Sequence, residues 1–249
     1  GHCVSLCPSD ALIHSEIFTE NENEAKNILS DVKTDSFKLF SQVVKKRRSH
    51  RHFESREVPD AILEKIIDIA SYAPTGVNAR TVSLKVLRTP KRIRELSGAT
   101  VRHFAEQFSK FQAEEAFLKE HQFVISEESA YQLKRYERYK NMFKSYEKGF
   151  DPVFHKAPAL LLFHAPVNAP TPKDDCVIAA HTAVLAAETM DLGTCFVGLF
   201  CRACSESEEV SDMLSLPHGN MVYSAVAVGY PFLTFLKIPK RKRFNTVWE

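Results

Sequence analysis

The sequence lacks any apolar run that approaches the roughly 18 residues of a membrane-spanning helix. It also lacks an excess of one charge, because 33 Lys and Arg residues stand against 31 Asp and Glu residues. A nearly neutral chain is not a polyelectrolyte, so any basic function must be local. With 44% hydrophobic and 26% charged residues in 249, the composition is globular and excludes disorder, collagen, coiled coils and small disulfide scaffolds.

Several nucleotide-binding and hydrolase signatures are absent as well. Neither G-x-G-x-x-G nor G-x4-G-K-[ST] occurs, which argues against a Rossmann dinucleotide site and a P-loop. There is no G-x-S-x-G elbow and no H-E-x-x-H pair, so nucleophilic or metal chemistry by the protein itself has little support. His164 and His181 lie on apolar segments, where a core or dimer-contact role is commoner than catalysis.

The six cysteines are not spaced like an extracellular disulfide framework. Cys3 and Cys7, in G-H-C-V-S-L-C-P, resemble the end of the C-x2-C-x2-C-x3-C-P run of bacterial ferredoxins. The first two cysteines of that run are missing, so we interpret residues 1–36 as a ferredoxin-motif remnant followed by a polar linker; a chance C-x3-C-P is the alternative. The same start lacks the pattern of a secretory signal, and we expect a soluble cytoplasmic protein.

The cysteines later in the sequence give weaker evidence for a metal or redox site. Cys201 and Cys204 form a C-x2-C without a second pair at zinc spacing, which does not support a metal site. Cys195 lies in an apolar run and is expected to be a small buried residue of a strand.

Hydrophobic periodicity predicts an α+β or mixed α/β protein with several helices and few strands. Helical spacing covers residues 37–44, 60–70, 90–96 and 174–192, and strand patterns cover residues 82–87, 158–164, 194–200 and 221–228. Pro, Gly and Asn predict a turn at residues 73–78, and residues 205–208 form a capping box that would open a helix between the last two strands. The aromatic residues within 99–149 could form a lid or pack two surface helices, and their spacing favours packing.

Two basic clusters lie far apart in the sequence. One is residues 45–51, KKRRSHR, and the other comprises Lys237, Lys240, Arg241, Lys242 and Arg243. Either could be a solvated face, and the second could bind nucleic acid, although it lacks interleaved aromatic residues. If the clusters meet in space, their guanidinium and ammonium groups, with a serine hydroxyl, form a pocket suited to a phosphomonoester.

Five segments, in this order, resemble the nitroreductase family of FMN flavoproteins. They are residues 47–53 (RRSHRHF), 73–78 (APTGVN), 175–176 (DC), 192–198 (LGTCFVG) and 239–242 (PKRK). The resemblance covers residues 37–249, and the start of the chain is similar to the branch with an N-terminal ferredoxin domain. It implies an α+β fold with a central, mainly antiparallel sheet flanked by helices, in an intertwined homodimer with two FMN sites at the subunit interface.

The resemblance also implies roles for particular residues. The residues matched to the FMN phosphate and ribityl chain are Arg47, Arg48, Ser49 and Arg51, joined by Lys240, Arg241 and Lys242. The loop that reaches the flavin from the other subunit corresponds to Pro74, Thr75, Gly76 and Asn78. Gly198 and Leu199 match the backbone that faces the flavin ring near N5. Because the cofactor carries the chemistry, we name no catalytic side chain and no metal ligand.

The implied reaction is ping-pong. NAD(P)H, or reduced ferredoxin, reduces FMN at N5 and leaves, and an acceptor such as a nitroaromatic or quinone then takes the electrons. A non-catalytic FMN relay or sensor coupled to a ferredoxin is the main alternative, and iodotyrosine dehalogenation or flavin fragmentation are known among relatives. After Asn78 this chain departs from the family pattern, because Arg80 stands where a neutral amide is common. This cation suggests an anionic donor or acceptor.

Overall fold

The computed structural model describes residues 11, 35–120, 139 and 141–249. Cys3, Cys7 and nearly all of the predicted linker lie outside these residues. Contacts between Cα atoms divide the chain into two units, residues 1–44 and residues 45–249, and helix α3 (Ser36–Lys46) crosses that boundary. Among the described helices, none is both long enough and apolar enough to cross a membrane.

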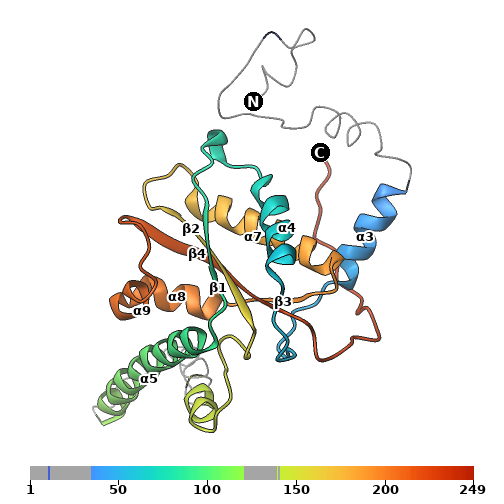
Figure 1. Cartoon of the computed structure of the whole chain (residues 1–249). Coiled ribbons are helices and arrows are strands. Elements are labelled where there is room, and N and C mark those ends of the chain that lie inside the picture. The colour runs from blue at the N-terminus through green and yellow to red at the C-terminus, as the bar shows by residue number, and fades with distance from the viewer. Residues whose placement is uncertain (1–10, 12–34, 121–138, 140) are drawn as a thin grey trace. The chain divides into compact units, whose positions relative to one another are not determined.

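The second unit is built on an antiparallel sheet, and in the described part of the chain this sheet has four strands in the order β1-β2-β4-β3 (Figure 1). The strands are β1 (Ser83–Leu87), β2 (Ala159–Pro166), β3 (Gly193–Phe196) and β4 (Asn220–Gly229). Every neighbouring pair is antiparallel. This arrangement confirms the expected α+β class with a mainly antiparallel sheet.

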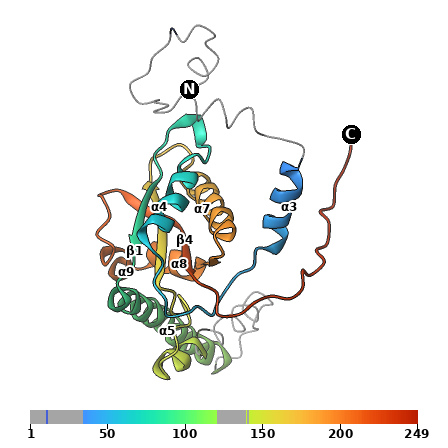
Figure 2. The same ribbon diagram turned by 45° about the vertical axis from the view of Figure 1, so that its right-hand side comes forward.

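Helices cover both faces of the sheet (Figure 2). One face packs against α4 (Asp60–Ser71) and α7 (Pro172–Thr189), and the other against α5 (Pro90–Glu120), α8 (Gly198–Glu206) and α9 (Glu208–Asp212). Strand β2 shows why its sequence is continuously apolar: Leu161 and Phe163 enter the first layer, whereas Leu160 and Leu162 enter the second. A strand buried on both faces has no polar side to display.

Most predicted elements are confirmed, but α5 is much longer than expected. The pattern predicted a helix over residues 90–96, and the helix continues to Glu120. Gly98 does not end it, because its missing side chain makes room for Tyr146: a Cβ on Gly98 would lie 2.6 Å from the Tyr146 hydroxyl oxygen. The glycine is a packing residue within the helix rather than its terminus.

The predicted strand over residues 194–200 is wrong beyond residue 196. The Val197 N–H still donates to the Ala225 carbonyl (2.9 Å), but the Val197 carbonyl accepts from the Phe200 N–H (3.0 Å) and so starts α8 at Gly198. A short apolar run fits a strand and a buried helix equally well, so periodicity could not separate them.

The predicted capping box at residues 205–208 is also wrong. Ser205 lies inside α8, where its hydroxyl donates to the Arg202 carbonyl (2.8 Å). The cap of α9 is Ser207 instead, whose hydroxyl oxygen accepts from the Val210 N–H at 3.4 Å.

Two aromatic residues of the 99–149 stretch belong to the core, as the preferred interpretation predicted. Phe104 is fully buried and its ring stacks on that of Tyr139, with 4.7 Å between the ring centroids. The arginine of α8, Arg202, donates to the Tyr139 hydroxyl (3.2 Å), which ties this pair to the sheet layer below. Residues 121–138, where a lid could lie, are outside the described part.

Candidate functional site

The basic segment 47–51 docks on strand β3. Ser49 forms a parallel bridge with Thr194, and the His50 N–H donates to the Thr194 carbonyl at 2.9 Å. The approach is close enough to require glycine at position 193, because a Cβ there would lie 2.7 Å from Cγ of His50. The local sequence therefore fixes the RRSHR backbone against one edge of the sheet.

The next residues are held from the other side. Phe53 forms an antiparallel bridge with Pro231, the Glu54 N–H donates to the Tyr230 carbonyl (2.9 Å), and the Phe232 N–H donates to the His52 carbonyl (3.0 Å). The segment thus runs from β3 to the chain that follows β4. Both attachments are backbone bonds, so they leave the basic side chains free for other contacts.

The arginines of this segment form no close ion pair in the described chain, although burial raises the pKa of Glu188 and the charges of Lys46 and Arg47 act against that rise. In the parts of the chain that the structure describes, no carboxylate lies within ion-pair distance of Arg47, Arg48 or Arg51. Burial lowers the pKa of His50, and the charges of Arg47 and Arg48 lower that pKa further. Clustered guanidinium groups that form no ion pair favour a bound anion.

The charges of the basic segment also act on Cys195 in β3. Burial raises the pKa of the Cys195 thiol, and the positive charges of Arg51 and Arg47 act against that rise. Thr194 contacts the basic segment, and Gly198 follows only four residues later, about 13 Å along an extended chain. One strand edge therefore connects the cationic segment to the start of α8.

The start of α8 presents backbone donors. Because Phe200 and Cys201 donate back to the Val197 carbonyl, the N–H groups of Gly198 and Leu199 precede the first helical bonds. Gly198 is exposed, and a Cβ built on it would meet nothing within 4 Å. The helix start is thus accessible at Gly198, and the two N–H groups there have no helical acceptor.

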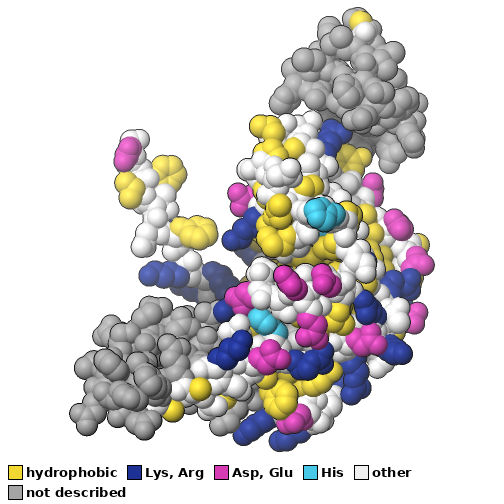
Figure 3. Space-filling model, turned by 90° about the vertical axis from the view of Figure 1, so that its left-hand side faces the viewer, with side chains coloured by type: hydrophobic (Ala, Val, Ile, Leu, Met, Phe, Trp, Pro, Cys, Tyr) yellow, Lys and Arg dark blue, Asp and Glu magenta, His cyan; other side chains and the backbone are white. Residues whose placement is uncertain are grey.

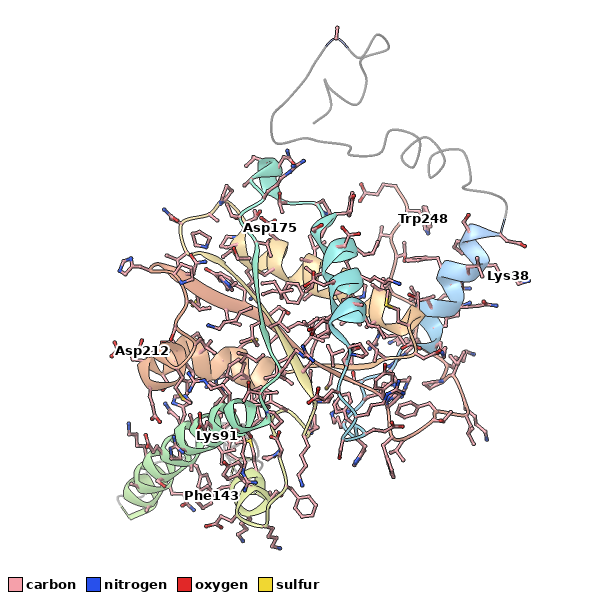
Figure 4. All side chains as sticks on the ribbon, in the orientation of Figure 1. Lys38, Lys91, Phe143, Asp175, Asp212 and Trp248 are labelled. Carbon is pink, nitrogen blue, oxygen red and sulfur yellow. The ribbon has the colours of Figure 1, made fainter. Side chains whose placement is uncertain are left out.

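The predicted turn at residues 73–78 contains the 3-10 helix η1 (Gly76–Asn78), and Pro74 and Asn78 are exposed. The Asn78 N–H donates to the Thr75 carbonyl, and the Gly76 N–H donates to Oδ1 of Asp175 at the start of α7 (2.9 Å). Figure 4 shows Asp175 beneath this turn. The loop is therefore ordered by contacts to α7.

A single copy of the chain does not bring this loop to its own basic segment. Figures 1 and 2 show η1 at one end of α4 and residues 47–54 near the other end. Helix α4 has 12 residues, so its length separates the two by about 18 Å.

The C-terminal tail approaches the basic segment through one aromatic residue. The Phe235 ring lies 5.1 Å from that of His50 and 5.2 Å from the guanidinium carbon of Arg48. Lys240, Arg241 and Lys242 follow on an exposed, irregular tail, and within the described chain they make no ion pair. Figure 3 shows the end of the tail, with Lys and Arg at its base and hydrophobic side chains beyond them. No sequence motif indicated the Phe235 contact.

Of the described cysteines, Cys176, Cys195 and Cys204 are buried, and so is His164. Cys195 is buried in β3, as predicted, and burial raises the pKa of Cys176 and Cys201 to about 12, so these thiols stay protonated. His164 is buried and its Nδ1 lies 2.8 Å from Nδ2 of Asn220. His181 is not a core residue of one copy, because it is exposed on α7.

Helix α7 is buried on only one face. Its other face carries a stripe at helical spacing that consists of Val177, Ile178, His181 and Leu185. Val177 and Ile178 are 42% and 41% exposed, and Tyr72, which follows α4, is 81% exposed. Helix α7 is therefore buried on one side only in an isolated chain, where no described residue covers this apolar surface.

A separate hollow lies between the start of α5 and residues 146–158. It has a volume of about 380 Å³, and its lining includes Arg88, Arg94, Phe150 and Lys156. None of the residues predicted for the site lines it. No sequence pattern indicated it, because its walls come from segments that lie far apart in the chain.

Together these features define an α+β protein with a cationic strand edge that leads to an open helix start. The sequence model of the Nitroreductase family matches residues 44–230, and the chain belongs to this family. A protein of Methanothermobacter thermautotrophicus, provisionally named NADH dehydrogenase/NAD(P)H nitroreductase, is 23% identical over 190 residues, which are 76% of each chain.

Two solved structures have the same fold. The nitroreductase with bound FMN from Bacteroides fragilis is 20% identical with a TM-score of 0.65, and the match covers 84% of this chain and 97% of that one. The FMN-bound nitroreductase from Desulfitobacterium hafniense is 21% identical with a TM-score of 0.61, over the same shares of the two chains. Sequence identity this low establishes the fold alone.

Proposed function

We propose that this protein is an FMN-dependent oxidoreductase. It takes electrons from NAD(P)H, or from reduced ferredoxin, and passes them to a small acceptor such as a nitroaromatic or a quinone. The observation that carries the proposal is the set of arginines in residues 47–51, which form no ion pair with any described residue. Their segment docks on β3, the strand that leads to the start of α8. Family membership and the two FMN-bound structures support the same cofactor.

The residues present fit FMN. Arg47, Arg48 and Arg51 supply charge-assisted donors for a phosphate dianion, and the Ser49 hydroxyl adds a neutral donor. The open space at Gly198 accommodates a flat ring. When bound, FMN would accept a hydride from the donor and pass electrons to the acceptor.

The protein's own part is to bind and orient. The N–H groups of Gly198 and Leu199 would donate to the electron-rich edge of the ring and favour its reduced state. Lys240, Arg241 and Lys242 would join the phosphate site from the tail. None of the four described thiols is suited to take part, because burial raises their pKa values.

We further propose that the active form is a homodimer. The loop of Pro74, Thr75, Gly76 and Asn78 lies at the end of α4 that is remote from the basic segment of its own chain. In a dimer, this loop would complete the site of the second copy. The apolar stripe on α7 provides a surface for that contact, because its burial would remove exposed hydrophobic area from water.

An absorption spectrum of the purified protein tests the proposal, followed by anaerobic addition of NADH, NADPH and reduced ferredoxin in separate cuvettes. Flavin bands that bleach with a nicotinamide support the reductase and identify its donor. Bleaching by ferredoxin alone favours the electron-relay alternative. A protein that binds no FMN after reconstitution contradicts the proposal.

A further inference from the structure

The loop between α4 and β1 contains three non-glycine residues in the left-handed region. These are Val77 at φ 49°, Asn78 at φ 55° and Arg80 at φ 51°. A β-branched residue rarely adopts this conformation, and such residues persist only where the surroundings hold them. Strained backbone of this kind concentrates at functional sites, and here the contacts of the loop with α7 hold it in place.

Asp175 is the residue that holds it. Its Oδ1 accepts from the Gly76 N–H at 2.9 Å and from the Thr171 hydroxyl at 2.8 Å. The side chain is 2% exposed, and Oδ2 has no hydrogen-bond partner among the described residues. Gly76 fits against Thr171 only because it lacks a Cβ, which would overlap the threonine hydroxyl.

Burial of a carboxylate at the start of a helix costs desolvation free energy. The neighbouring Asp174 already supplies an exposed acidic group to the first turn of α7. Burial of a second acid with one oxygen unpaired is unfavourable unless it serves another contact. The contact that it makes is to the loop.

The loop, in turn, presents Arg80. The Arg80 N–H donates to Oγ1 of Thr75 at 3.0 Å, and its Nε donates to Oδ1 of Asn78 at 3.3 Å. The side chain is exposed, and Nη1 and Nη2 have no hydrogen bond or ion pair with any described residue. A guanidinium fixed at Nε with both terminal nitrogens free matches the geometry of a carboxylate.

We propose that Asp175 is a positioning residue that holds residues 75–80 so that Arg80 selects carboxylate-bearing acceptors. This inference rests on the proposed function, because it requires that the loop border an acceptor site. It adds a substrate class: small organic acids, in preference to neutral molecules of the same size and reactivity.

The test uses two nitroaromatic acceptors that differ in charge, 4-nitrobenzoate and 4-nitrobenzamide. The FMN-loaded protein should show a higher kcat/KM for the anion. Arg80→Gln should lower the ratio of the two kcat/KM values about tenfold or more, mainly through KM, because charge-assisted bonds are lost. Arg80→Lys should keep part of the preference, since lysine keeps the positive charge but lacks the paired N–H donors of the planar guanidinium.

Asp175 is tested by a matched series. Asp175→Ala removes the acceptor oxygen and should lower the same ratio, whereas Asp175→Asn keeps an oxygen at the Oδ1 position and should restore much of it. Asp174→Asn removes the neighbouring charge without touching the loop and is the control. In protein without FMN, hydrogen exchange of the Gly76 amide should accelerate in Asp175→Ala and much less in Asp175→Asn.

An unchanged preference in Arg80→Gln would overturn the specificity inference, and equal exchange at Gly76 in the alanine variant and the parent protein would overturn the positioning role. If neither acceptor is reduced, the proposed function fails separately. Titration calorimetry of 4-nitrobenzoate and 4-nitrobenzamide then decides the role of Arg80, since equal affinity for both would contradict it.

Discussion

The junction between Gly193 and His50 provides the sharpest test of how the basic segment is positioned. Gly193 is buried, and a Cβ on it would lie 2.7 Å from Cγ and 2.9 Å from Cβ of His50. Both distances are far below normal carbon contacts, and neither atom is the end of a flexible chain. Gly193→Ala must therefore push the RRSHR backbone away from β3, where the His50 N–H donates to Thr194.

The magnitude follows from overpacking in a buried site. Such substitutions cost about 1–3 kcal/mol in the free energy of unfolding. For a chain of this size, that cost corresponds to a decrease in Tm of about 2–12 °C. If the segment holds the FMN phosphate, displacement of its backbone should also weaken FMN binding.

Gly198→Ala is the matched control for stability. A Cβ on Gly198 meets nothing within 4 Å, so the free energy of unfolding should stay the same or rise slightly, by up to about 0.5–1 kcal/mol for an alanine in a helix. The same Cβ enters the space assigned to the flavin ring, so the affinity for FMN should fall.

Both variants can be measured by thermal melts of FMN-free protein and by fluorescence titration with FMN. Gly193→Ala should lower both the Tm and the affinity for FMN, whereas Gly198→Ala should lower the affinity for FMN alone. A Gly193→Ala protein with parental Tm would show that His50 moves away freely. Parental FMN affinity in Gly198→Ala would show that the flavin ring does not bind at the start of α8.

Three further outcomes are expected. The double variant Arg47→Ala, Lys242→Ala should weaken FMN binding by about 10²–10⁴-fold, because each change removes a charged donor worth roughly 1.5–3 kcal/mol. The control Lys91→Ala, on α5, should bind FMN as the parent does. Parental FMN affinity in the double variant would disprove the phosphate site. The pKa of His50 is lowered in the folded chain, so the unfolded chain binds more protons than the folded chain below pH 6.5. The Tm should therefore fall as the pH decreases, and it should fall less steeply in His50→Gln. Equal slopes of Tm against pH in calorimetric melts would contradict this. Ile178→Lys should convert a dimer to monomers in light scattering after gel filtration, since a charge on the α7 stripe opposes its burial, and a surviving dimer would move the interface elsewhere.

Several parts of the fold could be predicted because their causes are local. Apolar spacing and Pro59 were enough to predict the start of α4 at Asp60, and the turn residues at 73–78 indicated where η1 lies. The continuous apolar pattern of residues 158–164 reflected a strand buried on both faces. In each case the residues that form the element also carry the signal.

Other features needed the whole chain. The α8 start at Gly198 depends on where pairing with β4 ends: the Val197 N–H still donates to the Ala225 carbonyl, and the Phe200 N–H then turns back to the Val197 carbonyl. Gly98 within α5 depends on Tyr146, more than 40 residues away in the sequence. Local patterns are ambiguous wherever a distant partner decides between two conformations.

In the candidate site, too, some features could be predicted from local sequence and others depend on distant contacts. The sequence by itself determined the chemistry available, since Arg47, Arg48 and Arg51 can be identified as a cationic cluster without any coordinates. Only the tertiary structure decided that this cluster docks on β3 without an ion pair to any described carboxylate, and that Asp175 accepts from the Gly76 N–H in the loop that carries Arg80. The physical reason is that charge is a property of a residue, whereas burial, pairing and backbone strain are properties of the contacts that the folded chain makes.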